Sequence, residues 1–192
     1  EELAALYATC QKYDLRLFID GARLGYGLVS AACDYDLPFL AKHCDVFYIG
    51  GTKVGAMMGE AVVFSGMKAP KYFFTNVKRH GALLAKGRML GIQFDTLFTD
   101  ELYFKISRHA IAMATRIRSI FEKHGIAIAY DSPTNQQFVV LSPTLYEALS
   151  QKVAFEIWER KSEHEIICRF VTSWATKEEE LDELDRILQA YA

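Results

Sequence analysis

IDGAR, at residues 19–23, and YIGGTK, at residues 48–53, are the two stretches that decide the fold of this chain. The first ends the apolar run 15–19 and the second ends the run 46–49, and each run has the length of a buried strand. Between them, Asp36-Leu37-Pro38 is typical of a helix N-terminus, and we expect a helix to about residue 43. Strand, helix and strand in this order predict a parallel pair joined by a right-handed crossover, and hence an α/β fold.

Each stretch places a charged side chain at the carboxyl end of its strand, Asp20 in the first and Lys53 in the second. Ligands of open α/β sheets bind at this edge. A lysine amine and an aspartate are what pyridoxal phosphate requires: the amine forms a Schiff base, and the carboxylate keeps the pyridine nitrogen protonated. The glycines before Lys53 let a bulky ligand approach the backbone. We expect the Lys53 amine to lose hydration there and to become a usable nucleophile.

Simpler interpretations of these charged residues remain open. Lys53 would also suit a solvated turn, which we weigh below the functional interpretation, and Asp20 would suit a helix N-cap, because Gly-Ala follows it. Arg23 would either pair with a surface acid or supply positive charge beside the cofactor ring or a bound carboxylate. A small basic cluster contains Arg79, His80, Lys86 and Arg88. Such clusters usually lie on solvated faces, although a cofactor phosphate would give this one a purpose.

Arg169 belongs to the predicted strand 166–173, where side chains alternate between the two faces. The alternation places Arg169 on one face with Ile167, Val171 and Ser173. A charged group among apolar neighbours is costly unless it is paired. Two interpretations stay open: an edge-strand arginine that extends its charge to water, or a bidentate contact to an amino acid carboxylate, which a planar guanidinium suits well.

The remaining pattern predicts helices over 1–13, 77–98 and 101–124, strands over 61–64, 126–129 and 138–141, and an irregular segment over 21–35. Thr176 with Glu179 resembles a capping box for the last helix. The apolar stripe of that helix is Leu181, Leu184, Leu188 and Tyr191. The part after residue 100 is typical of a separate α+β domain.

Composition excludes several partners. The chain of 192 residues has a net charge of −2 and no dense run of Lys or Arg, so we expect no nucleic-acid partner. Its apolar runs are short, so we expect no membrane partner. Its four cysteines form no CxxC pair and have no histidines at zinc spacing, so we expect no metal and reduced thiols in a cytoplasmic protein. The chain begins without Met or a signal pattern, and we expect a fragment or a polypeptide numbered from an internal residue.

Residues 17–25, 45–59, 79–94 and 169–176 resemble the threonine aldolase branch, of low-specificity type, of the aminotransferase-like, fold type I pyridoxal phosphate enzymes. The resemblance implies that residues 1–100 are the C-terminal part of the large cofactor-binding domain and that residues 101–192 are the small C-terminal α+β domain. The family's N-terminal portion, with its glycine-rich phosphate loop and a histidine that stacks on the ring, has no counterpart in this sequence. We therefore expect the isolated chain to be inactive.

The resemblance also implies roles for individual residues. Lys53 would be the Schiff-base lysine and Asp20 the partner of the pyridine nitrogen. Arg23 and Arg169 would lie at the substrate carboxylate. Arg88 would contact the cofactor phosphate of a neighbouring subunit, which implies a homo-oligomer, either a dimer or a tetramer.

The activity that follows from the resemblance is cleavage of threonine or allo-threonine, as β-hydroxy-α-amino acids, to glycine and an aldehyde. Two alternatives stay open. One is a β-eliminating lyase of the same fold, acting on tyrosine or tryptophan, which also needs the lysine and the aspartate. The other is a non-catalytic assembly fragment without bound cofactor.

Overall fold

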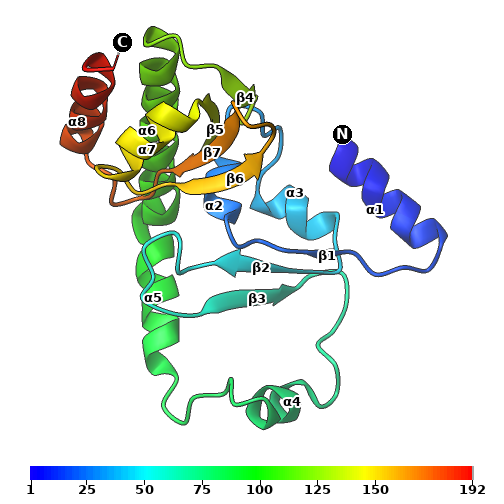
Figure 1. Ribbon diagram of the computed structural model, residues 1–192. Coiled ribbons are helices and arrows are strands. Elements are labelled where there is room, and N and C mark those ends of the chain that lie inside the picture. Colours follow the sequence, from blue (N-terminus) through cyan, green and yellow to red (C-terminus); the bar gives the residue numbers. More distant parts are fainter. Residues whose placement is uncertain (192) are drawn as a thin grey trace. The chain divides into compact units, whose positions relative to one another are not determined.

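The computed structural model describes residues 1–191. The chain divides into two compact units, the first with Glu1–Leu28 and Cys33–Lys105 and the second with Val29–Ala32 and the residues from Ile106 onward. Figure 1 shows the order of the helices and strands along the chain. The assignment of 1–100 and 101–192 to a large and a small domain stays a prediction, because compactness alone does not say to which enzyme domain a unit corresponds.

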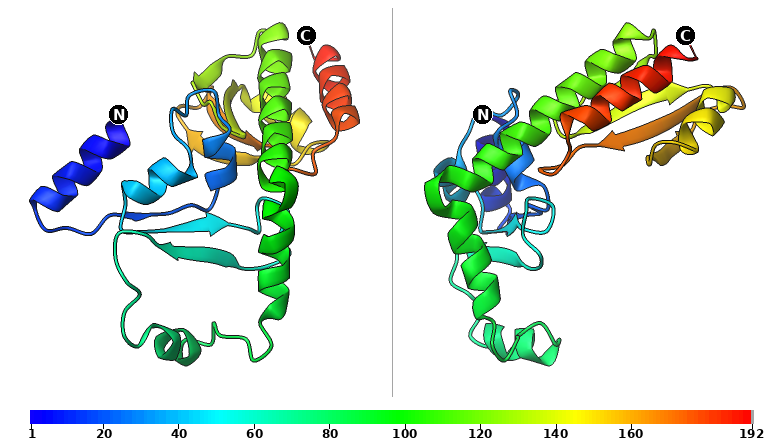
Figure 2. Two further views of the ribbon diagram at one scale, coloured as in Figure 1. Left: turned by 180° about the vertical axis from the view of Figure 1, so that it is seen from behind. Right: turned by 90° about the vertical axis from the view of Figure 1, so that its left-hand side faces the viewer.

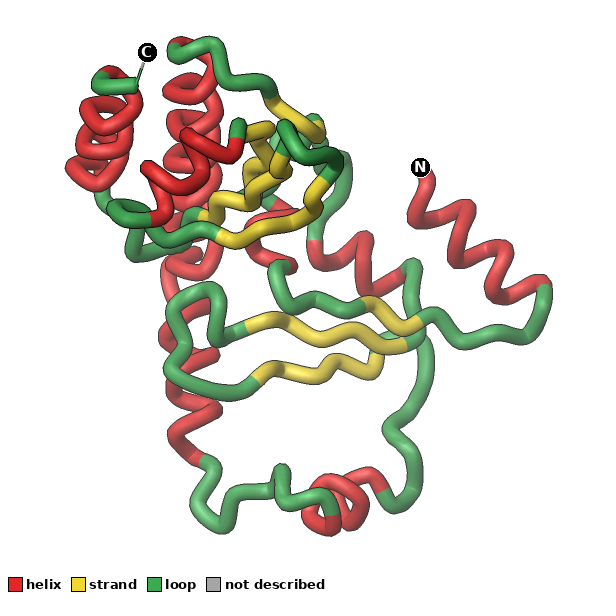
Figure 3. The backbone as a smooth tube through the Cα atoms, viewed as in Figure 1, coloured by secondary structure: helices red, strands yellow, loops and turns green. Residues whose placement is uncertain are grey.

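A three-stranded sheet in the order β1-β2-β3 forms the centre of the first unit (Figure 3). β1, Phe18–Ile19, pairs in parallel with β2, Val46–Gly50, with Ile19 opposite Phe47. β3, Glu60–Phe64, pairs antiparallel with β2 on its other side. The parallel pair predicted from the strand–helix–strand pattern is confirmed.

Six helical segments accompany this sheet: α1 Glu2–Lys12, α2 Leu24–Leu28, α3 Leu37–Lys42, α4 Phe73–Arg79, α5 Arg88–Phe98 and the short 3-10 helix η1 Thr99–Glu101. The predicted start of α3 is confirmed, because the Asp36 carboxylate accepts a hydrogen bond of 2.8 Å from the Phe39 amide. The central strand β2 thus follows a helix whose beginning the sequence specifies locally.

Three expectations for the first unit are wrong. The run 15–19 forms only a two-residue strand, and Leu15 and Phe18 are 58% and 57% exposed, because the preceding backbone binds the Asp45 carboxylate through the Leu17 amide at 2.8 Å instead of continuing the ladder. The segment 21–35 is not irregular throughout, since it contains α2. The helix predicted over 77–98 is interrupted after Arg79, where Gly81 has a φ of +73°, and resumes only at α5.

A four-stranded antiparallel sheet in the order β4-β5-β7-β6 forms the second unit. Its strands are β4 Ile128–Tyr130, β5 Gln136–Leu141, β6 Glu156–Arg160 and β7 Ile166–Val171. Its helices are α6 Leu102–Lys123, which begins in the first unit, α7 Pro143–Ser150 and α8 Glu178–Gln189. Figure 2 shows α6 and α8 along one face of the sheet. The core between them includes Met113, Phe121, Val139, Cys168, Phe170 and Leu184.

The long helix predicted over 101–124 is confirmed as α6, and Gly125, shortly after its end, has a φ of +70°. The capping box predicted for the last helix is wrong by one residue: the Lys177 amide donates to Glu180 at 3.0 Å, and the Thr176 hydroxyl instead accepts from the Ser173 amide. Tyr191 is 49% exposed and does not belong to the buried stripe of α8.

The sequence analysis missed α7 and β6. The start of α7 had a readable signal, because Ser142 caps it and Pro143 follows. β6 reads EIWER and is exposed along its whole length, so no alternation of apolar and polar residues marks it.

Candidate active site

The loop after β1 is in direct backbone contact with the end of β2, from which the Lys53 loop continues. The Gly50 amide donates to the Gly21 carbonyl at 2.9 Å. A Cβ atom on Gly21 would lie 1.7 Å from the Tyr48 carbonyl oxygen, and one on Gly50 would lie 2.4 Å from the Ala22 carbonyl oxygen. Neither position has room for a side chain, so glycine is required at both. This contact brings the segments that carry Asp20 and Lys53 together.

Two buried tyrosines hold the same pair of loops. The Tyr103 hydroxyl accepts from the Gly25 amide at 3.0 Å and donates to the Gly50 carbonyl at 3.0 Å. Burial raises the pKa of the Tyr103 phenol, so its proton remains available to donate. Tyr26, on α2, is 1% exposed and donates its hydroxyl hydrogen bond to the Lys53 carbonyl. The backbone at Lys53 is therefore fixed from α2, the helix that follows the Asp20 loop.

Side-chain hydrogen bonds also hold the backbone of segment 51–59, which contains Lys53, near both of its ends. Glu60, at the start of β3, accepts from the Gly51 amide at 2.8 Å through one carboxylate oxygen. Gln93, on α5, accepts from the Met57 amide at 2.6 Å. The backbone of this segment is thus held by side chains from a strand and a helix, which position it more rigidly than the loop could by itself.

Asp20 is exposed and accepts two hydrogen bonds on the same carboxylate oxygen, Oδ1: one from the Tyr48 hydroxyl and one from the Ala22 amide at 3.0 Å. The Tyr48 hydrogen bond, the Ala22 amide and then the positive charges of Lys53 and Arg23 lower the pKa of Asp20. Its carboxylate is therefore anionic at neutral pH. The N-cap interpretation is wrong, because Asp20 closes a turn onto Ala22 and α2 begins only at Leu24.

The other predicted residues of this unit differ in their surroundings. Arg23 is partly buried, and its Nε atom is buried without a hydrogen-bond partner among residues 1–191. The Lys53 side chain is exposed, so the loss of hydration expected for its amine is not found in this chain. Arg88 is exposed at the first position of α5, and within the described part of the chain no hydrogen bond or ion pair joins it to Asp20 or Lys53. The roles predicted for these residues stay predictions.

Arg169 lies in the second unit, on β7, and the structure corrects both expectations about its surroundings. β7 is an interior strand, between β5 and β6, so Arg169 is not an edge-strand residue. Its guanidinium is not unpaired among apolar groups: it donates to Gln136 at 2.9 Å, pairs with Glu156 and lies 5.3 Å from the centre of the Trp158 ring. The Arg169 Nε atom has no partner among the described residues, although it is buried. Gln136 and Glu156 thus hold the Arg169 guanidinium in place, while its Nε donor makes no hydrogen bond to the described residues.

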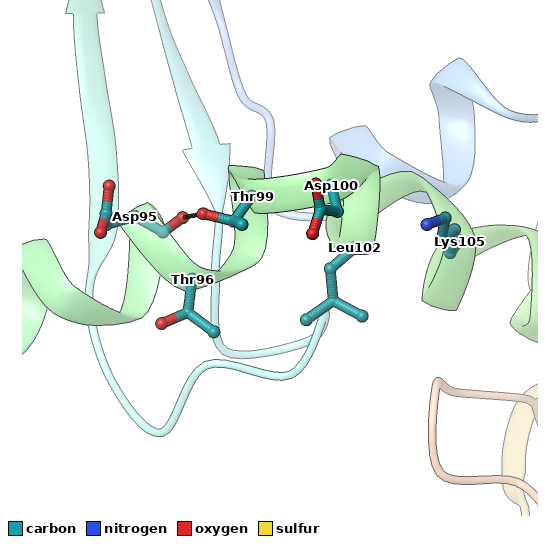
Figure 4. Close-up of a pocket in the computed structure, with 6 residues that line it drawn as sticks. All are labelled: Asp95, Thr96, Thr99, Asp100, Leu102 and Lys105. Carbon is teal, nitrogen blue, oxygen red and sulfur yellow. Dashed lines mark hydrogen bonds between the residues drawn. The ribbon is translucent and has the colours of Figure 1, made fainter.

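One cavity of this chain lies apart from the predicted site residues. A cavity of about 350 Å³ lies at the junction of α5 and α6. Figure 4 shows the residues that line it: Asp95, Thr96, Thr99, Asp100, Leu102 and Lys105. None of these is a predicted site residue. Asp20 follows β1, Lys53 follows β2, and both side chains are exposed.

Metal and thiol chemistry receive no support from the described residues. No group of three or more His, Cys, Asp or Glu side chains in residues 1–191 is placed to hold a metal ion. All four cysteines are free thiols, as expected. Cys168 is fully buried, and burial raises its pKa to about 11, which makes it a poor nucleophile.

Among residues 1–191, no helix is long and apolar enough to cross a membrane.

Sequence reasoning missed four residues that shape the site: Tyr26, Tyr48, Glu60 and Tyr103. Tyr48 and Glu60 had a signal, because each is a hydrogen-bonding side chain at or beside a strand that carries the site. Tyr103 had none, since it is 78 residues from Gly25 in the sequence and nothing local indicates that contact.

The chain is similar to known threonine aldolases. A low specificity L-threonine aldolase of Pseudomonas sp. (strain NCIMB 10558) is 29% identical over 191 residues, which cover 99% of this chain and 54% of that protein. A solved threonine aldolase of Leishmania major has 37% identity and a TM-score of 0.95, covering 99% of this chain and 56% of its own. The chain thus spans about half the length of these relatives.

More distant structures share the fold. The serine palmitoyltransferase of Sphingomonas wittichii has a TM-score of 0.67 at 12% identity, with 98% of this chain and 50% of its own covered. The fold is therefore that of the fold type I enzymes, a pyridoxal phosphate-dependent class. The model of the beta-eliminating lyase family matches residues 1–144, three quarters of the sequence, and the chain belongs to that family.

Proposed function

We propose that the whole protein is a pyridoxal phosphate-dependent lyase that cleaves threonine or allo-threonine to glycine and acetaldehyde. The observation that carries the proposal is the backbone contact between the loops of Asp20 and Lys53, which holds an anionic carboxylate and an amine at one edge of a sheet. The threonine aldolases among its relatives favour the substrate class.

The residues present fit this cofactor. Asp20 has one oxygen, Oδ2, to which no described residue donates a hydrogen bond, and it is the natural acceptor for a ring N–H. The Lys53 amine is exposed and free to bond to an aldehyde carbon. The buried, unpartnered Nε of Arg23 is a donor without an acceptor, which an anionic group of the ligand would supply.

Each residue then has a definite task in the proposed reaction. When bound, pyridoxal phosphate supplies an electron sink for the carbanion that cleavage of the Cα–Cβ bond leaves. Asp20 holds a proton at the pyridine nitrogen, because its anion stabilises the ring N–H. Arg169 orients the substrate by binding the carboxylate of the amino acid, and Arg23 adds positive charge beside the cofactor ring or that carboxylate. Arg88 would contact the phosphate in a neighbouring subunit, so we propose a homo-oligomer.

The decisive experiment is to locate the lysine that binds the cofactor. The protein is incubated with pyridoxal phosphate and reduced with borohydride, and the modified peptide is identified by mass spectrometry. We expect modification at Lys53, its loss in Lys53→Ala, and no change in the control Lys68→Ala, which alters an exposed lysine outside the site. Modification at another lysine in the wild-type protein would contradict the proposal.

The second candidate is a β-eliminating lyase, which the family match favours. Product analysis separates the two activities. Threonine should give glycine and acetaldehyde, whereas β-elimination of tyrosine would give phenol, pyruvate and ammonia. Turnover of tyrosine or tryptophan without turnover of threonine would replace the first proposal by the second.

A further inference from the structure

The carboxylate of Asp20 is engaged at only one of its two oxygens. The Tyr48 hydroxyl and the Ala22 amide both donate to Oδ1, and no hydrogen bond from the described residues reaches Oδ2. Two donors on one oxygen fix the plane of a carboxylate, since rotation about the Cβ–Cγ bond would break both hydrogen bonds. The exposed carboxylate therefore presents a single free oxygen in a single orientation.

Tyr48 is well placed to fix that orientation because it lies in the middle strand of its sheet. β2 pairs with β1 on one side and with β3 on the other, where Tyr48 is opposite Val62. The Tyr48 ring also packs near the ring of Phe18, with 6.1 Å between the centroids. A side chain supported by paired strands locates a hydroxyl more closely than a loop residue would.

We propose that Tyr48 is a positioning residue for Asp20: by binding Oδ1, it directs Oδ2 toward the ring N–H of a pyridine-type cofactor. This inference rests on the proposed function and adds a residue to it. Tyr48 itself touches neither the cofactor nor the substrate in this proposal.

The hydrogen bond also adjusts the charge of the site. It is the largest cause that lowers the pKa of Asp20, and the same bond raises the pKa of Tyr48 to about 12. An Asp20 carboxylate that shares its charge with a phenol is a weaker base. A proton between Asp20 and a pyridine nitrogen then stays on the ring, where the proposed chemistry needs it.

The first test needs no cofactor. Tyr48→Phe keeps the ring and its contact with Phe18 but removes the hydroxyl. We expect the pKa of Asp20, followed by NMR with ¹³Cγ-labelled aspartate, to rise toward its ordinary value. The control Tyr13→Phe alters a tyrosine that is 64% exposed and should leave the Asp20 titration unchanged. An Asp20 titration that is the same in wild type and Tyr48→Phe would overturn the proposal.

The second test measures what the fixed orientation contributes to binding. Without Tyr48, the Asp20 side chain must be immobilised when the cofactor binds, so we expect Tyr48→Phe to weaken pyridoxal phosphate binding by about 2- to 10-fold, measured by absorbance titration. An unchanged affinity together with a shifted Asp20 titration would overturn the positioning role. A wild-type protein that binds no pyridoxal phosphate would instead overturn the proposed function, which the cofactor-free titration distinguishes.

Discussion

The substitution Tyr103→Phe tests how the candidate site is held together. It removes one hydroxyl that serves two backbone groups: it accepts from the Gly25 amide and donates to the Gly50 carbonyl, both at 3.0 Å. Gly25 lies in the first turn of α2, where amides have no partner within the helix. The variant therefore leaves a helix-terminal N–H group without its acceptor in a buried place.

The expected loss of stability follows from burial. Tyr103 is 0% exposed, so water cannot readily replace the hydroxyl. A buried donor left unsatisfied costs about 1–3 kcal/mol, and an ordinary hydrogen bond contributes about 0.5–1.5 kcal/mol. The Gly25 amide becomes the unsatisfied donor and the Gly50 carbonyl loses an ordinary hydrogen bond, so we expect the free energy of unfolding to fall by about 1.5–4.5 kcal/mol.

Denaturant unfolding measures this change, with Tyr13→Phe as the control in which an exposed tyrosine loses the same atom. Hydrogen exchange then reports where the change acts. In each protein, the exchange rate of the Gly25 amide is compared with the rate expected from global unfolding. We expect this ratio to be about 10- to 100-fold higher in Tyr103→Phe than in wild type. An unfolding free energy within about 0.5 kcal/mol of wild type, with unchanged protection of Gly25, would refute the argument that this hydroxyl holds the loops.

Three further outcomes are expected. Asp20→Asn should preserve the fold but remove the charge that keeps the ring nitrogen protonated. Amino acid cleavage should therefore slow by several orders of magnitude, each tenfold loss corresponding to about 1.4 kcal/mol of barrier. Near-normal turnover would contradict the role of Asp20. Arg169→Lys keeps the charge but loses the planar fork, so KM for threonine should rise about tenfold while pyridoxal phosphate binding survives, and an unchanged KM would argue against a carboxylate contact. Hydrogen bonds from Lys123, the last residue of α6, and from His124 after it lower the pKa of Asp185, so the stabilisation by Asp185 should be present above pH 3.8 and should disappear as pH falls further. The difference in unfolding free energy between wild type and Asp185→Asn, measured against pH, checks this, and a difference that grows in acid would show the opposite sign.

Elements with a strong local signal could be predicted from the sequence. The Asp36 cap of α3 and the glycine shortly after α6 each depend on residues close together in the chain, and β1 and β2 are each marked by a local apolar run. Elements that depend on distant contacts could not. β6 is exposed along its length and exists because it pairs with β7, and its sequence EIWER carries no apolar alternation.

The same distinction applies to the candidate site. Asp20 and Lys53 could be found because each follows a strand, and the ends of neighbouring parallel strands meet at one edge. What holds them could not be found: the Tyr103 hydroxyl contacts residues 53 and 78 positions away. The polar partners of Arg169 were missed for a similar reason, since Gln136 and Glu156 reach it only through the pairing of β5, β7 and β6.

The close approach of the two site loops restricts how the sequence can vary. Gly21 and Gly50 face carbonyl oxygens, those of Tyr48 and Ala22, and every amino acid carries the same carbonyl. No replacement on the opposite loop can therefore make room, and a change at one glycine has no compensating change elsewhere. A library randomised at both positions should return glycine at each independently, without covarying pairs. Gly27, which has no atom within 4 Å of its would-be Cβ, should accept many residues in the same selection.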